Sequence, residues 1–127
     1  MKIEHLAIWT RDLEAMKAFY MKYFHGVPND KYTNEAKGFE SYFVSFESGA
    51  RIELMRKPGL MDQADRINFM GYAHLAFSVG SKDKVIGLTE TLRKDGFTIF
   101  GEPRTTGDGY FESVVLDPEG NLIEITV

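Results

Sequence analysis

GYAHLAFSV, residues 71–79, repeats a pattern that stands near the N-terminus as IEHLAIW, residues 3–9. His74 and His5 take the same place in the two stretches, and apolar residues follow both of them. Both stretches are rich in the aliphatic and aromatic residues that favour extended structure. The pattern therefore predicts a β-strand at the start of each half of a duplicated chain.

Each copy also has a glutamate near its C-terminal end. SGARIEL, residues 48–54, aligns with EGNLIEI, residues 119–125, and this alignment matches Glu53 with Glu124. Side chains alternate between the two faces of a strand, so each histidine and each glutamate points away from its aliphatic neighbours. We assign the aliphatic face to packing against a helix. All four residues are therefore expected on the other face of a curved sheet.

Changes of periodicity along the chain predict the remaining elements. The first copy is expected to contain strands over 3–9, near 31–33, over 39–46 and over 50–56, with a helix over 12–24 after the first strand. The second copy is expected to contain strands over 72–79, 97–100, 110–116 and 122–127, with a helix from about 81 to 94. Thr10 or Asp12 can cap the first helix, and Gly26 suits a left-handed exit from it.

These elements predict an α+β fold in which two β-α-β-β-β modules form a curved mixed sheet. We expect one domain over residues 1–127, with module one at about 1–56, a connection at 57–70 and module two at about 71–127. At 127 residues, with 43% hydrophobic positions, the chain is long enough for one such domain.

Composition excludes several classes of function. The formal net charge of −4 argues against nucleic acid as a partner, and the absence of cysteine excludes a disulfide framework and a cysteine nucleophile. No apolar run approaches the roughly 18 residues of a membrane span, so no membrane partner is expected. We expect a cytoplasmic protein that acts on a small molecule.

Two imidazoles and two carboxylates at matched positions suit a borderline divalent metal ion, of which Ni²⁺, Co²⁺, Zn²⁺ and Mn²⁺ are candidates. A lone strand histidine is more often a core or surface residue, and a lone glutamate is more often solvated. The repetition of both residue types favours one shared metal site built from His5, Glu53, His74 and Glu124.

The duplicated unit resembles the vicinal oxygen chelate superfamily, which includes glyoxalase I (lactoylglutathione lyase), bleomycin-resistance proteins and extradiol dioxygenases. The segments that carry the resemblance are EHLA (4–7), GARIEL (49–54), AHLAF (73–77) and DPEGNLIE (117–124). Within the superfamily, the full His, Glu, His, Glu set resembles glyoxalase I. This implies that the four residues bind one divalent metal ion and that Glu124, or its counterpart Glu53, is the catalytic base.

The implied reaction converts the hemithioacetal of a 2-oxoaldehyde and a thiol to a 2-hydroxyacyl thioester, by proton transfer through an enediolate. Two positions depart from bacterial glyoxalase I, which usually has a glutathione-contacting arginine at the position of Trp9 and an asparagine at that of Lys57. The thiol is therefore left open. The resemblance also implies a homodimer, whose metal site lies within one chain or is shared between two.

Other members of the superfamily remain as alternatives. Methylmalonyl-CoA epimerase uses related proton transfer, but it usually has glutamine at the position of Glu53. An extradiol dioxygenase would need further acid–base histidines, for which only His25 is left, and a fosfomycin-type transferase needs only three protein ligands. A bleomycin-resistance type of protein would bind a cationic drug in an acidic, aromatic cleft without catalysis. Such proteins generally lack the four ligands.

Overall fold

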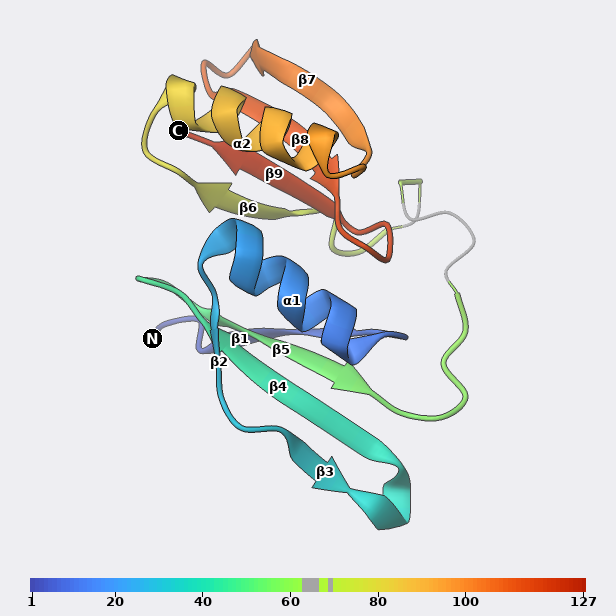
Figure 1. Cartoon of the computed structure of the whole chain (residues 1–127). Coiled ribbons are helices and arrows are strands. Elements are labelled where there is room, and N and C mark those ends of the chain that lie inside the picture. The colour runs from blue at the N-terminus through green and yellow to red at the C-terminus, as the bar shows by residue number, and fades with distance from the viewer. Residues whose placement is uncertain (63–66, 69) are drawn as a thin grey trace. The chain divides into compact units, whose positions relative to one another are not determined.

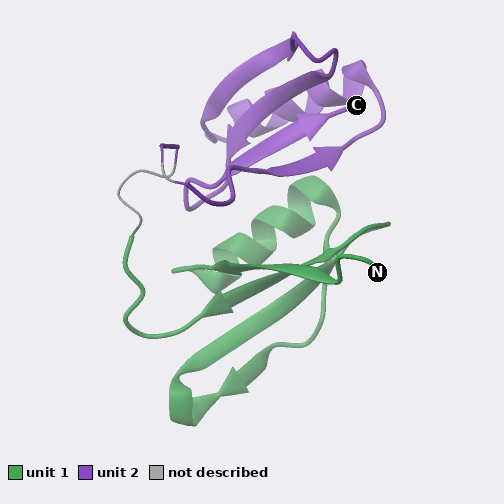
Figure 2. Cartoon of the chain, turned by 180° about the vertical axis from the view of Figure 1, so that it is seen from behind, with its two compact units in different colours: residues 1–62 green, residues 63–127 purple. Residues whose placement is uncertain are grey.

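The two copies fold as two units. The computed structural model of the 127-residue chain describes residues 1–62, 67–68 and 70–127. It divides into two compact units, residues 1–62 and residues 63–127 (Figure 2). Each unit has its own sheet and its own helix. The part of the expected connection at residues 63–66 and 69 lies outside the described residues.

The first unit contains a mixed sheet covered by one helix (Figure 1). Its elements are β1 (His5–Trp9), α1 (Leu13–Phe24), β2 (Val27–Pro28), β3 (Tyr32–Asn34), the 3-10 helix η1 (Glu35–Lys37), β4 (Phe39–Ser45) and β5 (Arg51–Arg56). The strand order is β1-β5-β4-β2, and β3 also pairs with β4. β1 and β5 run parallel, whereas β4 is antiparallel to β5, β2 and β3.

The second unit repeats this plan with four strands. Its elements are β6 (Leu75–Ser78), α2 (Lys82–Lys94), β7 (Ile99–Thr105), β8 (Phe111–Leu116) and β9 (Leu122–Thr126). The strand order is β6-β9-β8-β7, with β6 and β9 parallel and the other pairs antiparallel. The predicted α+β fold of two β-α-β-β-β modules is confirmed, in the form of two mixed sheets, one in each unit.

Helix α1 packs against one face of the first sheet because its apolar residues recur at helical spacing. Its buried residues are Leu13, Met16, Phe19, Tyr20, Tyr23 and Phe24. From the sheet, Val44, Ile52 and Leu54 are buried as well. Asp12 begins the helix as the N-cap, since its carboxylate accepts a hydrogen bond of 2.9 Å from the backbone N–H of Ala15.

The end of α1 differs from the expectation. His25 takes the left-handed conformation (φ 55°), so the prediction that Gly26 provides this exit was wrong. Gly26 is required for space, because a Cβ there would lie 2.5 Å from Cγ1 of Val44 and 3.1 Å from the backbone oxygen of Tyr20. A glycine after a helix suggests a residue with positive φ. The sequence alone does not show how closely Val44 of β4 approaches the end of this helix.

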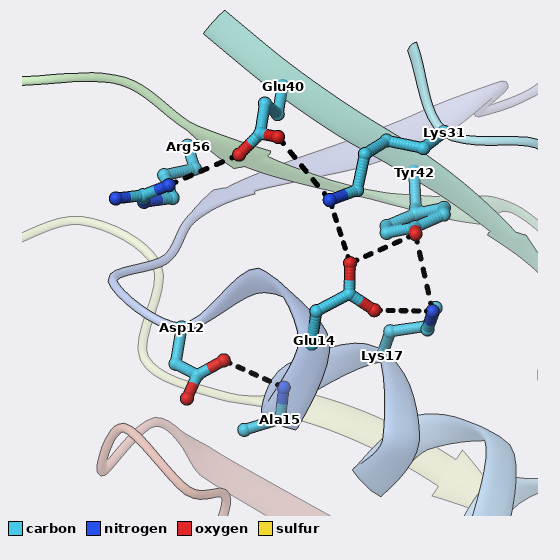
Figure 3. A network of polar contacts seen from close by, with 8 residues as sticks. All are labelled: Asp12, Glu14, Ala15, Lys17, Lys31, Glu40, Tyr42 and Arg56. Atoms are coloured by element: carbon cyan, nitrogen blue, oxygen red, sulfur yellow. Dashed lines mark hydrogen bonds and ion pairs between the residues drawn. The ribbon is translucent and has the colours of Figure 1, made fainter. Parts of the chain in front are cut away.

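A network of hydrogen bonds and ion pairs links α1 to the sheet beside this core (Figure 3). Its members are Glu14 and Lys17 of α1, Lys31 before β3, Glu40 and Tyr42 of β4, and Arg56 of β5. Tyr42 donates its hydroxyl proton to Glu14 at 3.0 Å and accepts a hydrogen bond from Lys17 at 3.2 Å. Hydrogen bonds from Lys17 and Lys31 lower the pKa of Glu14 to about 2, so this carboxylate is charged at neutral pH.

Helix α2 covers one face of the second sheet in the same way. Val85 and Leu92 are fully buried, and the Thr89 hydroxyl lies 2.7 Å from that of Ser113 on β8. Ser81 is the N-cap, with its hydroxyl accepting a hydrogen bond from the backbone N–H of Lys84 in the first turn. In the described parts of the chain, neither helix is long and apolar enough to cross a membrane.

β7 is longer than expected. The sequence pattern predicts a short strand over 97–100, and Gly101 and Pro103, which follow it, both disfavour strand interiors. The strand continues to Thr105, and its pairing with β8 shifts register on both sides of Gly101. Such irregularities, together with the position of β7 at the edge of its sheet, accommodate a proline. Arg104, which lies beyond the expected end of this strand, is therefore part of β7.

Candidate functional site

The first unit brings His5 and Glu53 together. β1 and β5 lie side by side, with His5 opposite Arg51 and Ala7 opposite Glu53. Because side chains alternate along each strand, His5 and Glu53 point away from α1, on what we call the helix-free face of the sheet. His5 Nε2 lies 3.8 Å from Glu53 Oε2, and the small side chain of Ala7 leaves room beside them.

Three further residues surround His5. Glu4 contacts His5 Nδ1 with its carboxylate and forms an ion pair with Arg51. The Phe43 ring meets the His5 ring edge-on at 5.3 Å, and the Arg51 guanidinium lies 4.2 Å from the centre of the Phe43 ring. The hydrogen bond with His5 and, after it, the one from Arg51 lower the pKa of Glu4. With Nδ1 engaged by Glu4, Nε2 is the nitrogen that faces Glu53.

The second unit brings His74 and Glu124 together. His74 Nε2 lies 3.4 Å from Glu124 Oε2. β6 begins only at Leu75, so the prediction that His74 lies inside a strand was wrong, although His74 directly precedes it. Glu124 pairs with Ala76 across the parallel strands β6 and β9, which repeats the pairing of Ala7 with Glu53. Both glutamates therefore stand beside an alanine on a helix-free face.

Glu112 is a neighbour of this second pair that the sequence patterns did not single out. It shares a face of β8 with Val114, which is paired with Glu124. Partial burial and the negative charge of Glu124 raise the pKa of Glu112. Alternation along β8 was the signal that could have identified it, but which residue of β9 it faces depends on the register of the hairpin.

Each pair could hold a metal ion. A metal bound to both atoms at about 2.0–2.2 Å would hold them roughly 3–4 Å apart, which fits the two nitrogen–oxygen separations of 3.8 Å and 3.4 Å. Histidine nitrogen and carboxylate oxygen also form a donor set suited to borderline divalent metals. No group of three or more histidine, cysteine, aspartate or glutamate side chains suited to a metal occurs among the described residues. Each unit thus contains two of the four residues that the sequence predicts as ligands.

Comparison with known proteins agrees with this fold. The sequence profile of the Glyoxalase/Bleomycin resistance protein/Dioxygenase superfamily matches residues 2–125. The uncharacterized protein YwkD of Bacillus subtilis is 35% identical over 114 residues, which cover 80% of this chain and 88% of that protein.

Two solved structures show the same fold at lower identity. A glyoxylase/bleomycin resistance protein/dioxygenase domain from Frankia sp. EAN1pec superposes with a TM-score of 0.84 at 20% identity, over 100% of this chain and 97% of that one. Glyoxalase I from Zea mays superposes with a TM-score of 0.81 at 22% identity, over 98% of this chain. The chain spans only 44% of the length of the maize protein.

Proposed function

Because the chain belongs to the glyoxalase/bleomycin resistance protein/dioxygenase superfamily, we propose that it is a metal-dependent lyase or isomerase of the glyoxalase I type. One observation carries this proposal: both units bring a histidine and a glutamate together, at 3.8 Å and 3.4 Å, on the face of the sheet opposite the helix. The proposed substrate is the hemithioacetal of a 2-oxoaldehyde and a thiol, and the product is a 2-hydroxyacyl thioester.

The two pairs jointly bind one divalent metal ion in this proposal. His5 and Glu53 supply two ligands, and His74 and Glu124 supply the other two. Ni²⁺, Co²⁺ and Zn²⁺ fit this donor set best, and Mn²⁺ fits it as well. The ion would act as a Lewis acid toward the oxygens of the substrate.

The two units then work together as one domain. Because each unit carries only half of the ligands, a complete site needs both pairs, either from one chain or from two chains of a homodimer. Duplication supports this arrangement, since each half presents the same two residue types on the same face. The proposal also includes a homodimer, which is the arrangement that the resemblance to glyoxalase I implies.

The protein's own residues move the proton. Glu124 removes the proton from the carbon that bears the hydroxyl and the sulfur, and returns it to the neighbouring carbon, while the hydroxyl proton passes to the oxygen of that neighbouring carbon. The product is an isomer of the substrate, so no oxidant or reductant is needed. Glu53 is the matching carboxylate of the first copy and a second candidate for the base. Glu112 provides a second carboxyl group close to this base. Its pKa is raised by partial burial and by the negative charge of Glu124.

An activity assay tests this function. Protein loaded with Ni²⁺, Co²⁺ or Zn²⁺ is mixed with methylglyoxal and one of several thiols, and formation of the thioester is followed. We expect turnover with at least one thiol and a loss of about 10²–10⁴-fold in Glu124→Gln, because general-base catalysis contributes about that much. Glu47→Gln is the matched control, since Glu47 is exposed and lies in the turn between β4 and β5, outside both His–Glu pairs.

Two results would contradict the proposal. Metal-loaded protein that converts none of the hemithioacetals, or a Glu124→Gln variant as active as the Glu47→Gln control, would exclude the proposed reaction. Metal binding with epimerisation of an acyl-CoA would favour the epimerase alternative. Absence of metal binding would favour a non-catalytic binding protein of the bleomycin-resistance type.

A further inference from the structure

A second cluster of side chains lies on the helix-free face of the first sheet, away from His5. Trp9 is four residues after His5 on β1 and so shares its face. The Trp9 ring meets the Phe39 ring edge-on at 6.2 Å, and Phe39 lies 6.0 Å from the Tyr32 ring. Trp9 is 43% exposed and Tyr32 is 54% exposed, so this aromatic cluster presents a large apolar surface.

Lys57 adds a positive charge to this cluster. It follows β5 directly, and its ammonium lies 4.4 Å from the centre of the Trp9 ring. Among the described residues no carboxylate pairs with Lys57, whereas the neighbouring cations Arg56 and Arg11 are paired with Glu40 and Asp62. Within the described residues the lysine charge is therefore not neutralised by a carboxylate, and it can attract an anionic ligand.

The spacing along the strands relates this cluster to the His5–Glu53 pair. Trp9 is two residues beyond Ala7, which lies opposite Glu53, and at about 3.3 Å per residue the aromatic cluster begins roughly 7 Å from that glutamate. Lys57 is four residues beyond Glu53, or roughly 13 Å along the same strand direction. One extended molecule could reach from the pair, across the aromatic rings, to the ammonium.

We propose that Trp9, Phe39 and Lys57 bind the non-reacting arm of the substrate, and that this arm is an aromatic or similarly flat apolar group ending in an anion. The rings provide stacking surface for such a group, and the ammonium provides the partner for its carboxylate or phosphate. A cationic ligand would be repelled by Lys57. The location of the reacting end at His5 and Glu53 rests on the proposed function, but binding of the arm does not depend on a metal.

The fluorescence of Trp9 makes this inference testable, because Trp9 is the only tryptophan of the chain. Metal-free protein is titrated with 4-phenylbutyrate, with its neutral analogue 4-phenylbutyramide, and with hexanoate as the non-aromatic anion. We expect a saturable fluorescence change with 4-phenylbutyrate and weaker binding of both analogues. Because the ion pair is exposed, the preference for carboxylate over amide should be about two- to fivefold.

Two variants separate the contributions of charge and ring. Lys57→Gln should remove the preference for carboxylate over amide, and Phe39→Leu should weaken both aromatic probes equally. Lys94→Gln, at an exposed lysine at the end of α2, is the control and should bind like the wild type. Urea unfolding of each variant establishes that it is folded before it is titrated.

Several results would overturn the inference. They are the absence of a saturable change, equal affinity for carboxylate and amide, or a carboxylate preference that survives in Lys57→Gln. Because the titration uses metal-free protein, its failure leaves the proposed reaction untouched. Conversely, a protein that binds the probe but neither binds metal nor turns over a hemithioacetal would refute the proposed function alone.

Discussion

Replacing Glu4 with glutamine is expected to weaken metal binding without removing a metal ligand. Glu4 contacts His5 Nδ1 and is itself held by Arg51, so that His5 Nε2 faces Glu53. Glutamine keeps the size of the side chain but removes its charge. The histidine would lose the carboxylate that fixes its tautomer and ring orientation, and Arg51 would lose its ion pair.

The exposure of Glu4 and His5 limits the loss of metal affinity expected in Glu4→Gln. Removing the partner that orients a ligating histidine typically costs 10–100-fold in metal affinity. Glu4 and His5 are 53% and 38% exposed, so water can replace part of the lost contact. The Phe43 ring still restrains the imidazole from the side. We therefore expect a loss near the lower end, about tenfold.

Competition of the protein with a chromophoric chelator for Co²⁺ or Zn²⁺, at fixed pH, measures this affinity. Glu47→Gln is the control, because it makes the same chemical change at an exposed site and should bind metal like the wild type. Wild-type affinity in Glu4→Gln would refute the orienting role of Glu4. An equal loss in Glu47→Gln would show that net charge, and not the contact with His5, sets the affinity.

Three further predictions concern the fold, and urea unfolding checks each of them. Gly26→Ala should destabilise the protein by about 1–3 kcal/mol, because its Cβ would overlap Val44. Gly87→Ala in α2, where a Cβ meets nothing within 4 Å, should instead stabilise the protein by up to about 1 kcal/mol. Equal effects of the two substitutions on stability would contradict this prediction. The pKa of Glu14 is lowered on folding, so its contribution to the free energy of unfolding is present above about pH 4.5 and is lost as the pH falls toward 2. Since the Glu14 side chain is 53% exposed, we expect this contribution to be about 1 kcal/mol or less. A Glu14→Gln variant whose stability falls with acid just as that of the wild type does would exclude the contribution. Thr10→Val should be neutral or stabilising, because the buried Thr10 hydroxyl has no hydrogen-bond partner among the described residues; clear destabilisation would reveal a missing partner.

The sequence predicted the faces of the candidate residues well. Alternation in strands is strict, so the aliphatic neighbours of His5 and Glu124 were enough to show which way these two residues point. Duplication supplied a second, independent instance of each residue type. The same signals could not give distances, which depend on strand pairing: only the parallel register of β1 with β5 shows that Glu53 stands beside Ala7 and within reach of His5.

Residues that matter through their neighbours were harder to predict. Glu112 lies near Glu124 only because β8 and β9 pair in one particular register. Glu4 is a charged residue beside an apolar strand, and only its contact with His5 in the structure indicates a role for it. Gly26 suggested a left-handed turn, whereas the close passage of Val44 is what requires glycine there. In each case the deciding contact joins segments that are distant in sequence or depends on the direction of a side chain.

The number of metal ions bound per chain tests the central claim most directly. Protein purified without chelator and then reconstituted with Ni²⁺, Co²⁺ or Zn²⁺ is analysed for metal, together with His5→Ala from the first unit and His74→Ala from the second. If the two His–Glu pairs form one site, the wild type binds one ion per chain, and both variants lose that same ion to a similar extent. Two ions per chain, no ion at all, or loss in only one of the two variants would contradict a shared site.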